Sequence, residues 1–195
     1  MRTFIRLAAL LAAAALAGCG SSPKSTFYTL SSGVPPQQAA ATAPFSVAIG
    51  ALTVPDVVDR PQFVTRTGAN QVTLDEFARW AEPLQREIPR VIADNLTREL
   101  NGALVSTYPQ SANISADCKV LLEVQRFDSA PGDAATIEVL WTVRPAKGEA
   151  KSGRSVVREA AGGAGYDALV AAHSRALASV SRDIAAAVRA VRAKP

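Results

Sequence analysis

The sequence predicts an α+β domain in which two amphipathic helices pack on one face of a mixed, largely antiparallel sheet of about six or seven strands. Short segments rich in β-branched and aromatic residues recur along the chain, and one of them alternates strictly between apolar and polar side chains. Two longer segments carry apolar residues at spacings of three and four, the period of a helix that buries one face. The order strands, helix, strands, helix is typical of this class.

The chain begins with an export signal. Arg2 and Arg6 precede an apolar run at residues 7–17, which is shorter than the roughly 20 residues that cross a bilayer as a helix. The letters LAGC, which end at Cys19, resemble the lipobox of bacterial lipoproteins. This resemblance implies that diacylglycerol is attached to the Cys19 thiol, that the chain is cut just before this cysteine, and that the new amine is acylated. The alternative is a soluble secreted protein in which Cys19 is incidental.

Lipidation would keep the mature protein on a membrane surface. Two or three acyl chains hold a protein almost permanently, whereas a single chain holds it only marginally. Gly20 and Ser21 follow the cysteine and neither is acidic, which favours the outer membrane, with the protein facing the periplasm. We therefore divide the chain into a signal peptide at residues 1–18, a lipidated tether with a short strand and a flexible linker at 19–44, and a single α+β domain at 45–195.

Composition argues against two kinds of site. The 21 Lys and Arg residues exceed the 17 Asp and Glu residues by a formal net charge of +4, which is too small and too evenly spread to indicate nucleic-acid binding. Besides Cys19 the chain has only Cys118, which we expect to be a small buried residue at the start of a strand, so a cysteine-based metal site is excluded. We expect no metal and no cofactor apart from the lipid on Cys19.

The first β-type segments lie close to the anchor. Residues 27–30 form a compact β-type segment, and residues 31–44 contain three prolines, which predicts a flexible connection. In residues 45–54 the apolar positions change phase around Gly50. This change predicts either a bulge at the glycine or a strand that is buried on both faces.

A hairpin and the first helix follow. Residues 62–66 and 71–74 are typical of a hairpin, because the four residues between them include Gly and Asn. Residues 83–101 carry leucine and isoleucine at a spacing of four, and Pro83 suits the first position of a helix. Pro89 lacks the backbone donor of an interior position, so we expect either a kink there or a helix that begins near residue 88.

Three strands and a second helix complete the domain. Residues 119–127 and 135–144 flank a turn, and residues 154–159 predict the last strand. In the second of these strands one face is apolar and the other polar. The apolar positions are Ile137, Val139, Trp141 and Val143, and the polar ones are Thr136, Glu138, Thr142 and Arg144. Residues 166–192 carry the longest apolar stripe of the chain and predict the C-terminal helix.

The sequence offers no set of residues typical of an enzyme. The only histidine, His173, falls on the apolar stripe between Leu169 and Leu177, so a hydrogen-bonded imidazole in the core is favoured over a catalytic base. Ser152 and Lys151 lie in a plain loop, and the G-x-S-x-G motif of hydrolases does not occur. We therefore expect no catalytic residues, although a hydrolase with a Ser–Lys or carboxylate pair stays formally open.

Two phrases carry a resemblance to a known family. The letters DRPQFVTR at residues 59–66 and RWAEPL at residues 79–84, placed after FYTL and a lipobox, resemble the ABC-type transport auxiliary lipoprotein family (PqiC-like). The resemblance implies a non-enzymatic periplasmic subunit anchored in the outer membrane. It would work with an MCE-domain protein and with ABC or PqiA-like membrane components that move lipids between the envelope membranes. A monomer and a homo-oligomer both remain open, and so does an envelope chaperone or tether that serves a secretin or peptidoglycan.

The same phrases supply the candidate partner-binding residues. Pro61 pushes the residue before it into an extended conformation, which projects the Arg60 guanidinium toward an acidic partner or a lipid headgroup. The alternative is a stiff turn in which Arg60 pairs locally with Asp59 or Asp56. For Trp80, the alternative is an indole that closes the end of the core while Arg79 stacks on it or pairs with Glu82. The full set of candidates is Asp59, Arg60, Pro61, Arg66, Arg79, Trp80 and Glu82.

Overall fold

A computed structural model describes residues 23–32, 45–110 and 115–193. These ranges hold two helices and eight strands, which confirms the α+β class. Cys19, the signal peptide and most of the predicted linker lie outside the described residues. The elements in chain order are β1 (Thr26–Tyr28), β2 (Ser46–Thr53), β3 (Gln62–Gly68), β4 (Gln71–Trp80), α2 (Leu84–Glu99), β5 (Leu104–Ser106), β6 (Cys118–Ala130), β7 (Ala134–Pro145), β8 (Lys151–Ala160) and α3 (Tyr166–Arg192).

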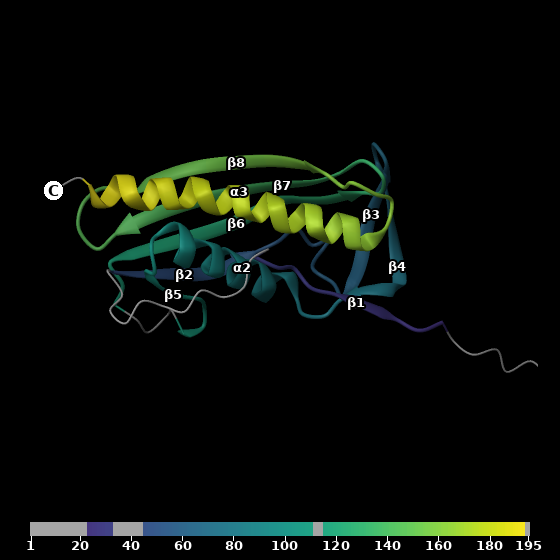
Figure 1. The fold of residues 1–195 in the computed structure, drawn as a ribbon, viewed down its shortest axis with the longest axis horizontal. Coiled ribbons are helices and arrows are strands. Elements are labelled where there is room, and N and C mark those ends of the chain that lie inside the picture. The colour runs from purple at the N-terminus through teal and green to yellow at the C-terminus, as the bar shows by residue number, and fades with distance from the viewer. Residues whose placement is uncertain (1–22, 33–44, 111–114, 194–195) are drawn as a thin grey trace, which may run out of the picture.

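The strands form two sheets instead of the single sheet that the sequence predicts. The larger sheet has five strands in the order β5-β2-β6-β7-β8, and the smaller has three in the order β1-β4-β3, at one end of the molecule (Figure 1). β5, a strand that the sequence analysis does not predict, has three residues, too few for an alternating pattern to be recognised. Alternation indicates which side chains face a core but not which strands pair, so the division into two sheets could not be read from it.

The larger sheet is mixed. β2 pairs in parallel with β5 and with β6, whereas β6, β7 and β8 are antiparallel neighbours. The register of β2 against β6 shifts between Ile49 and Leu52, which confirms the irregularity expected at Gly50. The smaller sheet contains the predicted hairpin, but its second strand continues to Trp80 instead of ending at residue 74.

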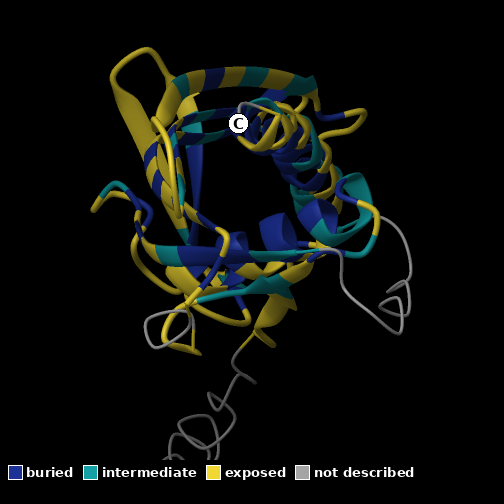
Figure 2. Ribbon diagram, turned by 90° about the vertical axis from the view of Figure 1, so that its left-hand side faces the viewer, coloured by how far each residue is buried: buried dark blue, intermediate teal, exposed yellow. Residues whose placement is uncertain are grey.

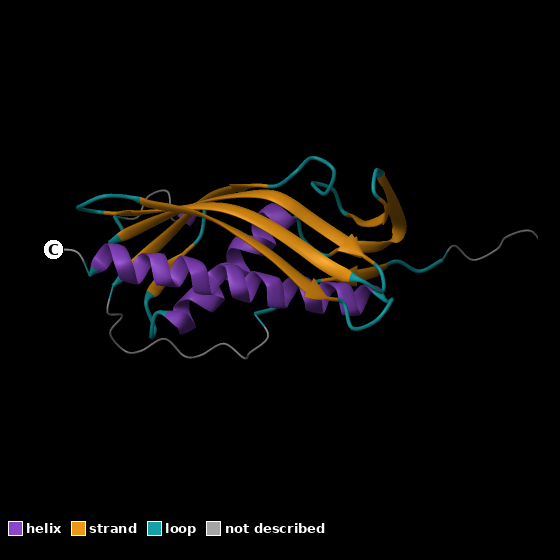
Figure 3. Cartoon of the chain, turned by 90° about the horizontal axis from the view of Figure 1, so that it is seen from above, coloured by secondary structure: helices purple, strands orange, loops and turns teal. Residues whose placement is uncertain are grey.

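Both helices pack on one face of the larger sheet, as predicted. Alternate residues of β6 and β7, such as Val120 and Ile137, are fully buried beneath the helices, while Leu121 on the opposite face is exposed. The helix α3 has the predicted bounds and runs along β7 and β8 (Figure 3). The sides of α2 and α3 that face the strands are buried, and their outer sides are exposed (Figure 2). The helices therefore close the core from one side.

The helix α2 runs through Pro89 without ending. It begins at Leu84 with Pro83 as its N-cap, so the alternative start near residue 88 is wrong and Pro83 lies one position before the predicted one. Pro89 removes a single backbone hydrogen bond in the second turn. Leu84 and Ile88 on either side of that turn are buried in the core, and this burial offsets the loss.

A cluster of aromatic rings joins the two sheets. Phe63 of β3 stacks on Trp80 of β4 with ring centroids 4.6 Å apart, and its edge contacts Tyr166 at the start of α3 at 4.9 Å. Trp80 in turn meets Phe127 of β6 edge to face at 6.0 Å. Each such pair contributes about 1 kcal/mol beyond the area that it buries. The small sheet is therefore fastened to the large one through its inner face, while Phe27 and Phe77 on its other face are exposed.

Candidate functional site

Five of the seven candidate partner-binding residues line one hollow. It has a volume of about 330 Å³ and lies where the loop before β3, the end of β4 and the start of α2 meet. We call it the β4–α2 hollow. Its lining residues are Asp59, Arg60, Pro61, Trp80, Ala81, Glu82 and Pro83. Ala81 and Pro83 were not among the candidates, although both stand within the quoted phrase RWAEPL.

Backbone hydrogen bonds hold the walls of the β4–α2 hollow together. Trp80 N donates to the carbonyl oxygen of Pro61 at 2.8 Å, and Ala81 N donates to that of Tyr28 at 2.9 Å. The side chain of Gln85 donates from Nε2 to Oδ2 of Asp59 at 2.8 Å. The prolines fix φ on both sides of the hollow. Its shape is therefore preorganised before any partner arrives.

Arg60 presents its charge to solvent. Its Nη2 donates to the backbone carbonyl of Asp56 at 3.4 Å, and within the described residues its guanidinium forms no ion pair. The alternative of a local contact is therefore confirmed in part: Arg60 bonds Asp56 through the backbone carbonyl and not the carboxylate, and Asp59 is engaged by Gln85 instead. The guanidinium remains available for a carboxylate or phosphate of a partner.

Trp80 shapes the hollow from the core side. Its side chain is only 5% exposed and stacks on Phe63, which confirms the alternative in which the indole closes the end of the core. The neighbouring Arg79 does not pair with Glu82, as that alternative expected, but with Glu76 at 3.3 Å. Successive side chains of a strand point to opposite faces, so Arg79 lies on the outer face of the small sheet.

Arg66 also lies outside the β4–α2 hollow. Its Nη2 contacts Oδ1 of Asp128 at 3.0 Å, joining β3 to β6. Burial by itself would raise the pKa of Asp128, but hydrogen bonds from Arg66 and Arg126 outweigh it and hold that pKa below its ordinary value. The same hydrogen bond raises the pKa of Arg66. This arginine ties the two sheets together, and its charge is already compensated.

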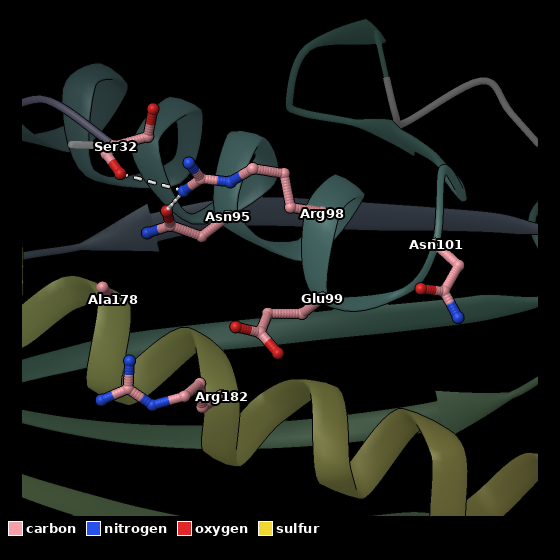
Figure 4. Close-up of a pocket in the computed structure, with 7 residues that line it drawn as sticks. All are labelled: Ser32, Asn95, Arg98, Glu99, Asn101, Ala178 and Arg182. Carbon is pink, nitrogen blue, oxygen red and sulfur yellow. Dashed lines mark hydrogen bonds between the residues drawn. The ribbon is translucent and has the colours of Figure 1, made fainter. Parts of the chain in front are cut away.

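The segment that follows β1 is fastened to both helices. Leu30 N donates to Oε1 of Glu87 at 2.9 Å, and Ser31 N donates to Oγ of Ser174 on α3 at 3.1 Å. Arg98 of α2 donates from Nη2 to the carbonyl oxygen of Ser32 at 2.9 Å and also contacts the side-chain oxygen of Asn95 (Figure 4). We call residues 28–32 with these partners the N-terminal latch. It fixes the chain to the domain within the range 19–44 that holds the predicted tether, short strand and linker.

Glu87 is the residue of the latch that the sequence analysis missed. Its side chain is fully buried on the apolar face of α2, and burial raises its pKa to about 7, against the opposing effects of Leu30 N–H and Arg90. The Arg90 guanidinium, at 3.5 Å, is too exposed to cancel the cost of burial. A carboxylate three residues after Leu84, on the stripe of apolar residues, was the signal that could have found it.

Two further hollows flank the helices. One, of about 500 Å³, lies between α2 and α3 and includes Ser32, Arg98 and Arg182 (Figure 4). The other, of about 390 Å³, shares Glu82 with the β4–α2 hollow and continues past Arg86 to Tyr108, whose side chain is 57% exposed. The second hollow extends the candidate partner surface along the start of α2.

The Ser–His pair of the described residues is closed to solvent. Ser129 Oγ and His173 Nε2 lie 2.8 Å apart, and the imidazole stacks on Phe127 with centroids at 3.9 Å. Both side chains are buried, and burial lowers the pKa of His173 to about 3. This confirms the prediction of a hydrogen-bonded imidazole in the core. No group of three or more potential metal ligands occurs among the described residues. Within those ranges, neither helix is long and apolar enough to span a bilayer.

A family model and solved structures match most of this chain. A family described as ABC-type transport auxiliary lipoprotein component matches residues 28–185. A search of curated proteins gives no match. A crystal structure of an uncharacterised protein superimposes with a TM-score of 0.69 at 19% identity, covering 85% of this chain and 99% of the other. A DUF330 protein from Xanthomonas campestris gives a TM-score of 0.58 at 19% identity, covering 83% of this chain and 91% of the other. These structures share the fold.

Proposed function

The chain belongs to the ABC-type transport auxiliary lipoprotein family, and on that premise we propose that it is a non-catalytic subunit of an intermembrane lipid transport system. The family match carries this proposal. In it, the protein is anchored by lipids on Cys19 in the outer membrane and faces the periplasm. It docks an MCE-domain protein that works with ABC or PqiA-like membrane components.

The β4–α2 hollow is the proposed docking site. Three features support this assignment: preorganised walls, a buried indole behind them, and an arginine whose guanidinium has no carboxylate partner among the described residues. An uncompensated guanidinium beside an apolar hollow suits a partner segment that carries a carboxylate next to apolar side chains. Asp59 and Glu82 on the same rim would disfavour partners of the wrong charge pattern.

Co-purification of the lipidated full-length protein with the MCE-domain protein tests the proposal. We expect Arg60→Glu to lower the captured amount at least tenfold, because it places a negative charge where the partner presents one. Arg144→Glu is the matched control, since Arg144 is exposed on the outer face of the larger sheet, away from the hollow. Equal loss with both variants, or no loss with Arg60→Glu, would exclude the hollow as the docking site.

A further inference from the structure

Four large apolar side chains are exposed on the small sheet. Their exposed fractions are 63% for Phe27, 46% for Phe77, 38% for Leu74 and 37% for Val72. Single exposed apolar residues are ordinary on protein surfaces, but several on one three-stranded sheet indicate a contact surface. Elsewhere in the described ranges, the exposed large apolar side chains belong to loops or to the larger sheet.

The strand register places these side chains on the outer face of the small sheet. Phe27 lies opposite Arg79, while Tyr28 and Trp80, one position further along each strand, turn inward to the aromatic cluster. Phe77 is two residues before Arg79 and therefore shares its face. The four apolar side chains form what we call the outer patch, together with the half-exposed arginine.

Side chains at the other end of β4 also divide between the inner and the outer face. Asp75 turns inward, where its Oδ2 accepts a hydrogen bond of 2.7 Å from Tyr166. Its neighbour Leu74 therefore points outward, and so does Val72 two positions earlier. Their register partners on β3 are Val64, which is only 7% exposed, and Arg66, whose guanidinium turns back to Asp128 of β6, so the exposed part of this face lies on β4 and β1.

The predicted lipid anchor is tied to the chain beside the outer patch. Thr26 pairs with Ala78 in a parallel ladder, so the chain enters the small sheet next to Phe77. Cys19 lies seven residues before Thr26 in the sequence, a span of about 25 Å at full extension. The N-terminal latch fastens the chain just after β1, so the length of this tether limits how far the small sheet can lie from the anchor.

We propose that the outer patch lies against the lipid leaflet that holds the anchor, with Phe27, Leu74 and Phe77 in the interface between headgroups and acyl chains. This inference rests on the lipid anchor of the proposed function. Aromatic and aliphatic side chains are stable at that depth, and the Arg79 guanidinium on the same face can approach lipid phosphates. The end of α3 at Arg192 then points away from the membrane, because it lies at the opposite end of the molecule (Figure 1).

Fluorescence quenching tests this orientation. Full-length lipidated protein carries a fluorophore on Leu74→Cys or Phe77→Cys, and vesicles of phosphatidylethanolamine and phosphatidylglycerol contain brominated acyl chains. The native Cys118 is fully buried and does not compete for the label. Leu140→Cys is the matched control, since Leu140 is 37% exposed on the larger sheet and Leu74 is 38% exposed. We expect bromine to quench the labels at 74 and 77 at least threefold more than the label at 140.

Equal quenching at positions 74 and 140 would overturn the proposal. Crosslinks that join the label at 74 to a second copy or to a protein partner would also overturn it, because the patch would then be a protein interface. Intact mass separates this failure from failure of the proposed anchor. A chain with lipid on Cys19 but no quenching at 74 refutes only the orientation, whereas an unmodified Cys19 refutes the anchor itself.

Discussion

At the scale of single residues, Glu87 and His173 show how burial shifts two ionisable groups in opposite directions. Both side chains are fully enclosed by the core. Burial disfavours the charged form of each, so it raises the pKa of Glu87 to about 7 and lowers that of His173 to about 3. Between pH 4.5 and 6.5 the folded protein holds a proton on Glu87 that the unfolded chain releases, and lacks the proton that His173 gains on unfolding.

Glu87→Gln should remove one pH dependence of stability. The pKa of Glu87 is higher in the folded state than in the unfolded chain. The contribution of this stronger proton binding to the free energy of unfolding is therefore fully present below about pH 4.5 and is lost as the pH rises through about 7. We expect the free energy of unfolding of the variant, relative to the wild type, to rise by about 1–3 kcal/mol between pH 4.5 and 8. Chemical denaturation of both proteins at both pH values measures these free energies. Subtracting the wild-type value from the variant value at each pH cancels the effect of His173, which both proteins share. A constant offset would contradict the assignment.

At the scale of elements, two consecutive hydrogen bonds connect α3 to the edge of the larger sheet. Trp141 Nε1 of β7 donates to Ser155 Oγ of β8 at 3.0 Å, and that hydroxyl donates to Asp183 of α3 at 2.6 Å. The indole can reach Ser155 because Gly153, its register partner on β8, has no side chain in the way. The absence of a Cβ at this glycine therefore helps to set the distance between sheet and helix.

Gly153→Ala should destabilise the protein. A Cβ at this position would overlap the ring of Trp141, which cannot move because it is buried and hydrogen-bonded. We expect a loss of about 1–3 kcal/mol in the free energy of unfolding and a lower Tm by several degrees in a thermal melt. Gly163→Ala is the control, since its added Cβ would meet only Ala168 at 3.4 Å. An unchanged Tm for Gly153→Ala would contradict the packing described.

At the scale of the whole molecule, the two ends of the fold have different roles in the proposal. The small sheet, the N-terminal latch and the start of α2 gather the predicted anchor, the outer patch and the β4–α2 hollow at one end. The long strands of the larger sheet and α3 extend away from that end side by side (Figure 3). Such an arrangement would hold a docking site within a short distance of the membrane.

Cys19→Ala, expressed behind an export signal that is cleaved without lipidation, should release the protein from the membrane. Without acyl chains, one exposed patch is too weak to hold the chain, so we expect it in the soluble periplasmic fraction, whereas the wild type sediments with outer membranes. Cys118→Ala is the control, because Cys118 is buried and its loss affects only packing. Membrane fractionation with intact-mass measurement reports both results. Equal sedimentation of the wild type and Cys19→Ala would remove the lipid anchor from the proposal.

The sequence by itself determined the local elements and their faces. The period of the apolar residues set the bounds of α3 and the inward face of β7, and the phase change in β2 marked its bulge, because these properties depend on neighbours along the chain. The position of His173 on an apolar stripe likewise sufficed to place it in the core. The quoted phrases identified the family and five of the residues that line the β4–α2 hollow.

Only the tertiary structure decided how distant segments meet. The pairing of β1 with β4, the division into two sheets, and the contact of Glu87 with Leu30 join residues far apart in the sequence. The tertiary structure also decided that Arg66 and Arg79 form ion pairs whereas Arg60 does not, since the partner of each arginine comes from the surrounding fold. The physical reason is that periodicity reports burial one element at a time, whereas strand pairing and ion pairing depend on the packing of the whole chain.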